Sequence, residues 1–109
     1  MATSSDRTSD SQAESWELKL EDQLVGTLTF EAQDMFWSDC RFHPGPAWED
    51  FRPLNDRSRE AWRRGDLEAA RTADDAIMTS GLVLVPLKGG APITPVMVRV
   101  EGDMARFRF

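Results

Sequence analysis

The spacing of apolar residues changes twice along the chain, and this limits the fold more than any other feature. In residues 16–30 and again in residues 96–109, large apolar residues alternate with polar ones, which is the period of a strand with one buried face. Between residues 51 and 78 the apolar residues recur every three or four positions, the period of an amphipathic helix. We therefore expect a helical segment with strands before and after it.

Three strands are predicted in the first half of the chain. Residues 16–20 and 24–30 form two of them, joined by a hairpin turn at residues 21–23. Residues 36–43 form the third, with Phe36, Cys40 and Phe42 on the core side, and Pro44-Gly45-Pro46 ends it.

Two helices are predicted in the middle of the chain. Pro53 suits the first turn of a helix, and Gly65 suits its C-terminal cap. Asp66 is the expected N-cap of the second helix, which Gly81 closes. Because so few residues separate them, the helices should form a hairpin. Asp74 lies near the apolar stripe of the second helix, and we expect it to pair with an arginine of the other layer.

Three further strands are predicted at residues 82–87, 96–100 and 105–109. Turns at Gly89-Gly90 and Gly102-Asp103 would join them as a meander, with Phe109 docked on the domain. The predicted fold is therefore α+β with two layers: an antiparallel sheet, in the chain order βββ-αα-βββ, with the helical hairpin packed on one face.

Composition limits the setting and the partners. We expect residues 16–109 to form a single domain and residues 1–15, rich in Ser, Thr and Asp, to form a disordered tail. The net charge of −6 argues against nucleic acid as a partner, although arginines outnumber lysines eleven to two. A single cysteine, a start unlike a secretory signal and the absence of a long apolar segment predict a cytoplasmic protein with no membrane association.

The stretch from Phe36 to Trp48 contains the only cysteine and the only histidine. It suggests one candidate function, a small enzyme with a cleft near the Pro44-Gly45-Pro46 loop that uses Asp39, Cys40 and His43. On an extended strand, however, Cys40 and His43 point to opposite faces about 10 Å apart, beyond hydrogen-bond reach. The ligand spacings of metal sites and the glycine-rich loops of phosphate sites are also missing, so the sequence predicts no metal and no cofactor.

A second candidate site is an exposed face with arginines and aromatic side chains. The alternation predicts outward positions on the third strand and on the last hairpin for Trp37, Arg41, His43, Arg99, Arg106 and Arg108. If those strands are neighbours, their guanidinium and indole groups would suit an acidic peptide or a small anion. The alternative is that these arginines only pair across the strands with Glu17, Glu31 and Asp39.

Three runs of residues carry a resemblance to a known group of proteins. They are DMFWSDCRFHPGPAWEDFRPL, GLVLVPLKGGAPI and EGDMARFRF. Over residues 16–109 the chain resembles a family of short bacterial proteins described only as uncharacterised. The resemblance implies a single domain, and it implies no activity and no site residues.

The leading interpretation is a small, non-enzymatic cytosolic binding or regulatory protein that acts through the arginine and tryptophan face. Immunity or inhibitor-like proteins belong to this class, since short acidic domains without cofactors are suited to blocking another protein. The expected partner is a protein or a second copy of the chain, with a small anion as a further candidate. The small enzyme remains the alternative.

Overall fold

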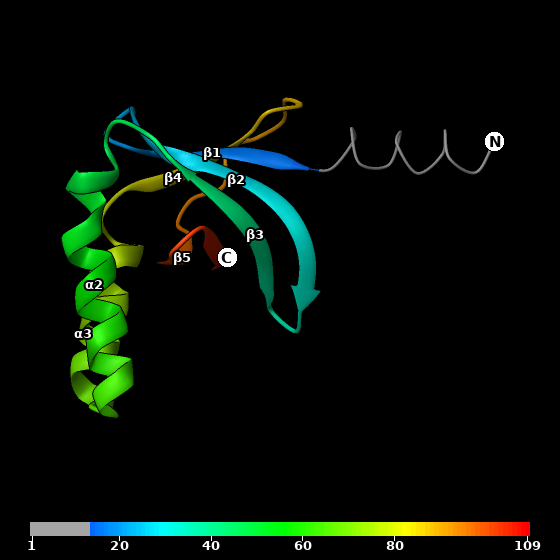
Figure 1. The fold of residues 1–109 in the computed structure, drawn as a ribbon. Coiled ribbons are helices and arrows are strands. Elements are labelled where there is room, and N and C mark those ends of the chain that lie inside the picture. The colour runs from blue at the N-terminus through cyan, green and yellow to red at the C-terminus, as the bar shows by residue number, and fades with distance from the viewer. Residues whose placement is uncertain (1–13) are drawn as a thin grey trace.

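A helical hairpin separates two groups of strands along the chain (Figure 1). The computed structural model describes residues 14–109. Its helices are α2 (Trp48–Arg64) and α3 (Leu67–Met78). Its strands are β1 (Ser15–Leu20), β2 (Gln23–Asp34), β3 (Trp37–Pro44), β4 (Leu82–Pro86), β5 (Met97–Glu101) and β6 (Met104–Arg108). The tail expected over residues 1–15 lies outside the described residues except for its last two.

The strands form one curled antiparallel sheet in the order β4-β1-β2-β3-β6-β5 (Figure 1). This confirms the α+β class and the predicted order of elements. The predicted meander is confirmed for its last two strands, since β5 and β6 pair on either side of Gly102-Asp103, but it is wrong for β4, which pairs with β1 and not with β5. Segment 87–96 instead runs from one edge strand to the other. It turns back at Gly89-Gly90, so that Ile93 pairs with Leu84 of β4 in a single antiparallel bridge, and then continues to β5.

Local signals explain most helix ends. Gly65 takes the left-handed conformation, with φ of 73°, at the C-terminal cap of α2, and the Asp66 side chain accepts the Ala69 N–H at 3.1 Å as the N-cap of α3. The prediction for Pro53 is wrong. The helix already begins at Trp48, so the proline lies inside it, where its missing N–H removes one backbone bond.

The core lies between the curled sheet and the helical hairpin. Phe51 of α2 is fully buried in it, and Trp48 packs edge-on against Phe42 of β3, with ring centroids 5.3 Å apart. On the sheet side, Trp16 packs edge-on against Phe107 at 4.9 Å. Burial of these rings between the two layers explains why the helices pack on the sheet.

Two expected core residues are exposed. Phe36 is 80 % exposed, because it lies in the turn before β3, where strand alternation does not apply. Phe109 is 81 % exposed, although its ring stacks on Phe107 at 6.3 Å. The predictions for Cys40 and Phe42 are confirmed, since both are buried on the core side.

Both edge strands are covered by polar contacts. At β5 the Asn55 side chain of α2 acts like a neighbouring strand: its Nδ2 donates to the Val100 carbonyl at 2.9 Å, and its Oδ1 accepts the Val100 N–H at 2.8 Å. At β4 the backbone of Leu84 exchanges hydrogen bonds with Ile93 at 3.0 and 2.9 Å. These contacts reduce the tendency of the edges to pair with other chains. Among residues 14–109, neither helix is long and apolar enough to cross a lipid bilayer.

Candidate functional site

Three neighbouring strands place arginines and a tryptophan on the same face of the sheet. Asp39 of β3 lies opposite Arg106 of β6, and Arg106 lies opposite Arg99 of β5. Residues paired in this way point to the same side, and Trp37 and Arg108 lie two residues along the same strands on that side. We call Trp37, Arg99, Arg106 and Arg108 the arginine–tryptophan face.

The guanidinium groups of this face lie against indole rings. The Cζ atoms of Arg99, Arg106 and Arg108 lie 5.1, 5.3 and 5.1 Å from the ring centroid of Trp37. Arg99 also lies 5.0 Å from the ring centroid of Trp62 on α2, so one guanidinium contacts two indoles. Each such contact contributes about 0.5–2 kcal/mol, depending on how far water is excluded. The arginines therefore form an ordered layer over Trp37.

Asp74 of α3 joins this layer to both helices. Its Oδ2 binds the Arg99 guanidinium at 2.9 Å and accepts the Trp62 Nε1–H at 3.1 Å, while its Oδ1 accepts the Ser58 hydroxyl at 2.6 Å. The predicted pairing of Asp74 with an arginine of the other layer is confirmed. Within the described part of the chain the buried Arg99 Nε has no acceptor, so Arg99 depends on Asp74 and the two indoles for its stabilisation.

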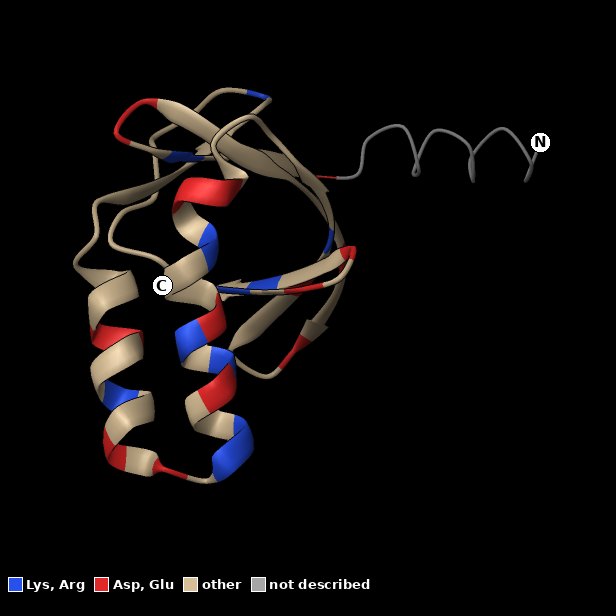
Figure 2. Cartoon of the chain, turned by 60° about the vertical axis from the view of Figure 1, so that its left-hand side comes forward, with Lys and Arg blue, Asp and Glu red and all other residues tan. Residues whose placement is uncertain are grey.

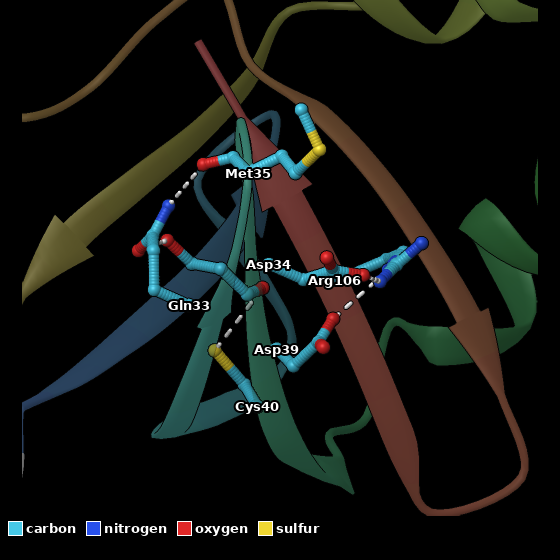
Figure 3. Close-up of polar contacts among 7 residues, drawn as sticks. Gln33, Asp34, Met35, Asp39, Cys40 and Arg106 are labelled. Atoms are coloured by element: carbon cyan, nitrogen blue, oxygen red, sulfur yellow. Dashed lines mark hydrogen bonds and ion pairs between the residues drawn. The ribbon is translucent and has the colours of Figure 1, made fainter.

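Arg106 is neutralised by two carboxylates. Its Nε binds Asp39 of β3 at 2.9 Å and its Nη2 binds Asp34 of β2 at 3.0 Å (Figure 3). The hydrogen bond to Asp39 is the main reason why the pKa of Arg106 lies above its ordinary value. Arg106 thus joins both strands of the β2–β3 hairpin to β6, and much of its charge is used within the chain.

Arg108 differs from the other two arginines of the face. It is exposed, and among the described residues no carboxylate lies within ion-pair distance of its guanidinium. Its contact with Trp37 leaves its donors open to solvent. Of the three guanidinium groups, that of Arg108 is the one most available to an external carboxylate.

The other two predicted site residues lie outside the arginine–tryptophan face. Arg41 binds Glu31 at 3.2 Å and Asp103 at 3.5 Å, both on exposed parts of the surface. His43 is exposed and lies opposite Thr27 of β2, toward the other end of β3. As the sequence predicts, the side chains of Arg41 and His43 are exposed. They lie four and six residues from Trp37 along β3, so they do not join the arginine–tryptophan face.

Cys40 is not placed for catalysis with His43. It is fully buried on the core side, and its thiol donates to the Ser38 carbonyl at 3.8 Å (Figure 3). Burial, reinforced by the charges of nearby Asp39 and Glu31, raises the pKa of Cys40 to about 12, so the reactive thiolate is suppressed. His43 lies three residues farther along the strand and points to the other face.

The other parts of the expected enzyme cleft do not come together either. The loop at residues 44–46 packs closely on β2, where the Gly45 N–H donates to the Val25 carbonyl at 2.8 Å and the Ala47 N–H to the Leu24 carbonyl at 2.8 Å. Asp39 is occupied by Arg106. Within residues 14–109 no group of three or more His, Cys, Asp or Glu side chains is arranged to hold a metal ion.

Two adjoining hollows lie between α2 and the outer face of β5 and β6. One has a volume of about 670 Å³ and the other about 390 Å³, and Arg59, Arg99 and Glu101 line both. Basic and acidic residues alternate along α2 (Figure 2), and Arg59 binds Glu101 at 3.4 Å. The hollows therefore extend the arginine–tryptophan face with a polar surface of mixed charge.

Sequence reasoning missed the contributions of Ser58 and Trp62. The helical spacing places both on one side of α2, and there they resemble ordinary members of a packing stripe. The signal that could have found them is Asp74, because a carboxylate close to an apolar stripe needs hydrogen-bond donors from the helix that it faces.

Comparisons of the chain with protein-family models, with curated proteins and with solved structures found no match.

Proposed function

We propose that this protein is a non-enzymatic cytoplasmic binding protein that holds an acidic segment of a protein partner on its arginine–tryptophan face. The observation that carries the proposal is the state of Arg108, an exposed guanidinium held against Trp37 with no carboxylate partner among the described residues. A carboxylate that approaches Trp37 would complete the pairing that Asp74 and Asp39 already provide for Arg99 and Arg106.

The order of the face supports this function. Trp37 and the three arginines are held by cation–π contacts and ion pairs, so little side-chain freedom remains to be lost on binding. Tryptophan and arginine are also the residue types that contribute most at protein interfaces. The adjoining hollows would accept the flanking side chains of a bound segment.

The alternative of a small enzyme lacks a reacting pair, because Cys40 and His43 point to opposite faces of β3. The cytoplasmic setting is supported only by the single cysteine, which is buried and free.

A defined acidic probe tests the proposal. We would titrate ¹⁵N-labelled protein with hexaglutamate and follow the indole and arginine side-chain NMR signals, with hexaglutamine as the neutral control. We expect hexaglutamate to shift the signals of Trp37 and Arg108 in a saturable way that high salt weakens. Equal responses to the two peptides would contradict the proposal.

Substitution of the key arginine gives the second test. Arg108→Gln keeps a polar side chain but removes the charge, and it should weaken hexaglutamate binding about fivefold, or about 1 kcal/mol. Arg57→Gln is the matched control, since Arg57 is an exposed arginine of α2 that lines a separate hollow. Affinity capture from native lysate with the wild type and with Arg108→Gln would then identify a natural partner. If Arg108→Gln and Arg57→Gln weaken hexaglutamate binding equally, the proposed role of Arg108 is refuted.

A further inference from the structure

The turn between β2 and β3 presents large apolar side chains to solvent. Met35 is 79 % exposed and Phe36 is 80 % exposed. Phe109, which is 81 % exposed, lies at the same end of the sheet, because Ser38 of β3 pairs with Phe107 of β6. Several large apolar side chains exposed at one end of a sheet are a feature of surfaces that contact another protein.

The turn is held in one shape by its own polar contacts (Figure 3). The Gln33 Nε2 donates to the Met35 carbonyl at 3.0 Å, and the Ser38 hydroxyl donates to the Gln33 Oε1 at 3.2 Å. At the base of the turn, Arg106 binds Asp34 at 3.0 Å. Since the backbone of the turn is ordered before any contact forms, it would lose little entropy on association.

Opposite charges lie on either side of Trp37 at this end of the sheet. Asp34 of β2 is paired with Trp37, and Arg108 of β6 lies against its ring on the other side. With strands about 4.8 Å apart, these two charged residues are separated by about 10 Å across Trp37. The Asp34 side chain is 60 % exposed, and among residues 14–109 only its Oδ2 is bonded, to Arg106. This end of the sheet therefore presents the Arg108 guanidinium and the Asp34 Oδ1 to a second copy.

We infer that a second copy of this chain covers this end of the sheet. A two-fold axis perpendicular to the sheet at this end brings Asp34 of each copy to Arg108 of the other, with Met35 and Phe36 packed between them. The surface is self-complementary because the negative and positive residues lie on opposite sides of its centre. Its small size indicates a weak, transient dimer with a dissociation constant of about 100 µM.

Strand-edge pairing is a less suitable way for two copies to associate. Beyond Phe30, the outer edge of β2 pairs with no strand among the described residues. If a second copy paired antiparallel along this edge, Glu31 of each copy would lie opposite Asp34 of the other. Like charges directly opposite each other are unfavourable.

This dimer goes beyond the proposed function, since it uses the hairpin turn, but it shares Arg108 with the acidic partner. The two contacts would compete for Arg108, so self-association would keep this guanidinium paired until an acidic partner displaces the second copy. The following tests need no acidic partner, so failure of the dimer leaves the proposed function to be judged separately.

Sedimentation equilibrium from about 10 µM to 1 mM tests the apolar part of the contact. We expect the mass of the wild type to rise toward that of a dimer, and Phe36→Ser to weaken the dimer about tenfold. Leu67→Ser is the matched control, since Leu67 is 59 % exposed at the turn of the helical hairpin, and it should leave the dimer unchanged. A wild type that stays monomeric throughout, or equal effects of the two substitutions, would overturn the inference.

A charge swap tests the ionic part. Arg108→Glu places two acidic groups together, and Asp34→Arg places two arginines together, so each variant alone should dimerise about tenfold more weakly. An equimolar mixture restores opposite charges at both contacts and should recover the dimer. Arg57→Glu makes the same change in net charge as Arg108→Glu, at a position outside the contact, and should leave the dimer unchanged. If the mixture stays monomeric while both variants remain folded by circular dichroism, the proposed pairing is refuted.

Discussion

Replacement of Asp74 by alanine should destabilise the domain more than any other change of a half-buried charge. Asp74 accepts from Ser58, Arg99 and Trp62, and so it ties α3 to α2 and to β5. Asp74→Ala removes all three bonds. Among residues 14–109 it leaves the Arg99 guanidinium without a counter-charge, and the Nε of that group already has no acceptor there.

The size of this effect follows from the burial of the pair. Removal of one partner from a buried ion pair costs about 3–5 kcal/mol. The side chains of Arg99 and Asp74 are 25 % and 19 % exposed, so water recovers part of the lost interaction. We therefore expect the free energy of unfolding to fall by about 2–3 kcal/mol, which lowers the melting temperature of a domain of this size by about 10–20 °C.

Urea denaturation followed by tryptophan fluorescence and by circular dichroism measures this change. The matched control is Asp75→Ala, because Asp75 is the exposed neighbour on the same helix, and its effect should stay within about 0.5 kcal/mol. In a double-mutant cycle with Arg99→Met, the double variant should be about 1–2 kcal/mol more stable than the sum of the single effects predicts. Additive effects, or a loss below about 0.5 kcal/mol for Asp74→Ala, would refute this account of the junction.

Three further predictions concern the core and the sheet edge. Gly26→Ala should cost about 2–3 kcal/mol in urea denaturation, because the new methyl group would overlap the ring of Phe42. Asn55→Ala should cost about 2–4 kcal/mol, since it leaves the buried N–H and carbonyl of Val100 unpaired. The pKa of Cys40 rises from 9.0 to about 12 on folding, so above pH 9 the unfolded chain releases a proton that the native chain keeps, and stability should fall between pH 9 and pH 12. The native thiol should likewise stay unreactive toward a disulfide reagent at pH 8 until the chain unfolds.

Each of these predictions has its own control. Thr27→Ala changes the next residue of β2, which is only half-buried, and should be much milder than Gly26→Ala. Asp56→Ala changes the exposed neighbour of Asn55 and should be nearly neutral. Cys40→Ala should flatten the alkaline fall in stability, and the chain contains no tyrosine that would titrate in the same range. If the slope persists in this variant, another group causes it.

Sequence reasoning succeeded where local chemistry decides the outcome. The caps at Gly65 and Asp66, and the burial of Cys40 and Phe42, follow from residue type and strand alternation. The pairing of Asp74 with an arginine was also foreseeable, because a charged group near an apolar stripe needs a partner.

The failures concern residues whose environment is set by distant parts of the chain. Phe36 and Phe109 look like core residues by alternation, but they lie beyond the ends of their strands. The position of β4 beside β1 depends on which surfaces the whole chain can bury, and no local pattern distinguishes this arrangement from a meander. Trp62 gave no local sign of its contact with Arg99, since its partners belong to other elements.

The sequence by itself therefore determined the elements of this protein, its α+β class and the outward register of the arginines, because hydrophobic period and capping act over a few residues. Only the tertiary structure decided which strands are neighbours and which charges are matched. Among residues 14–109, Arg99 and Arg106 bind carboxylates and Arg108 does not. The physical reason is that ion pairing depends on distances of a few ångströms between residues far apart in the chain, and only the packing of the complete sheet and the helical hairpin sets those distances.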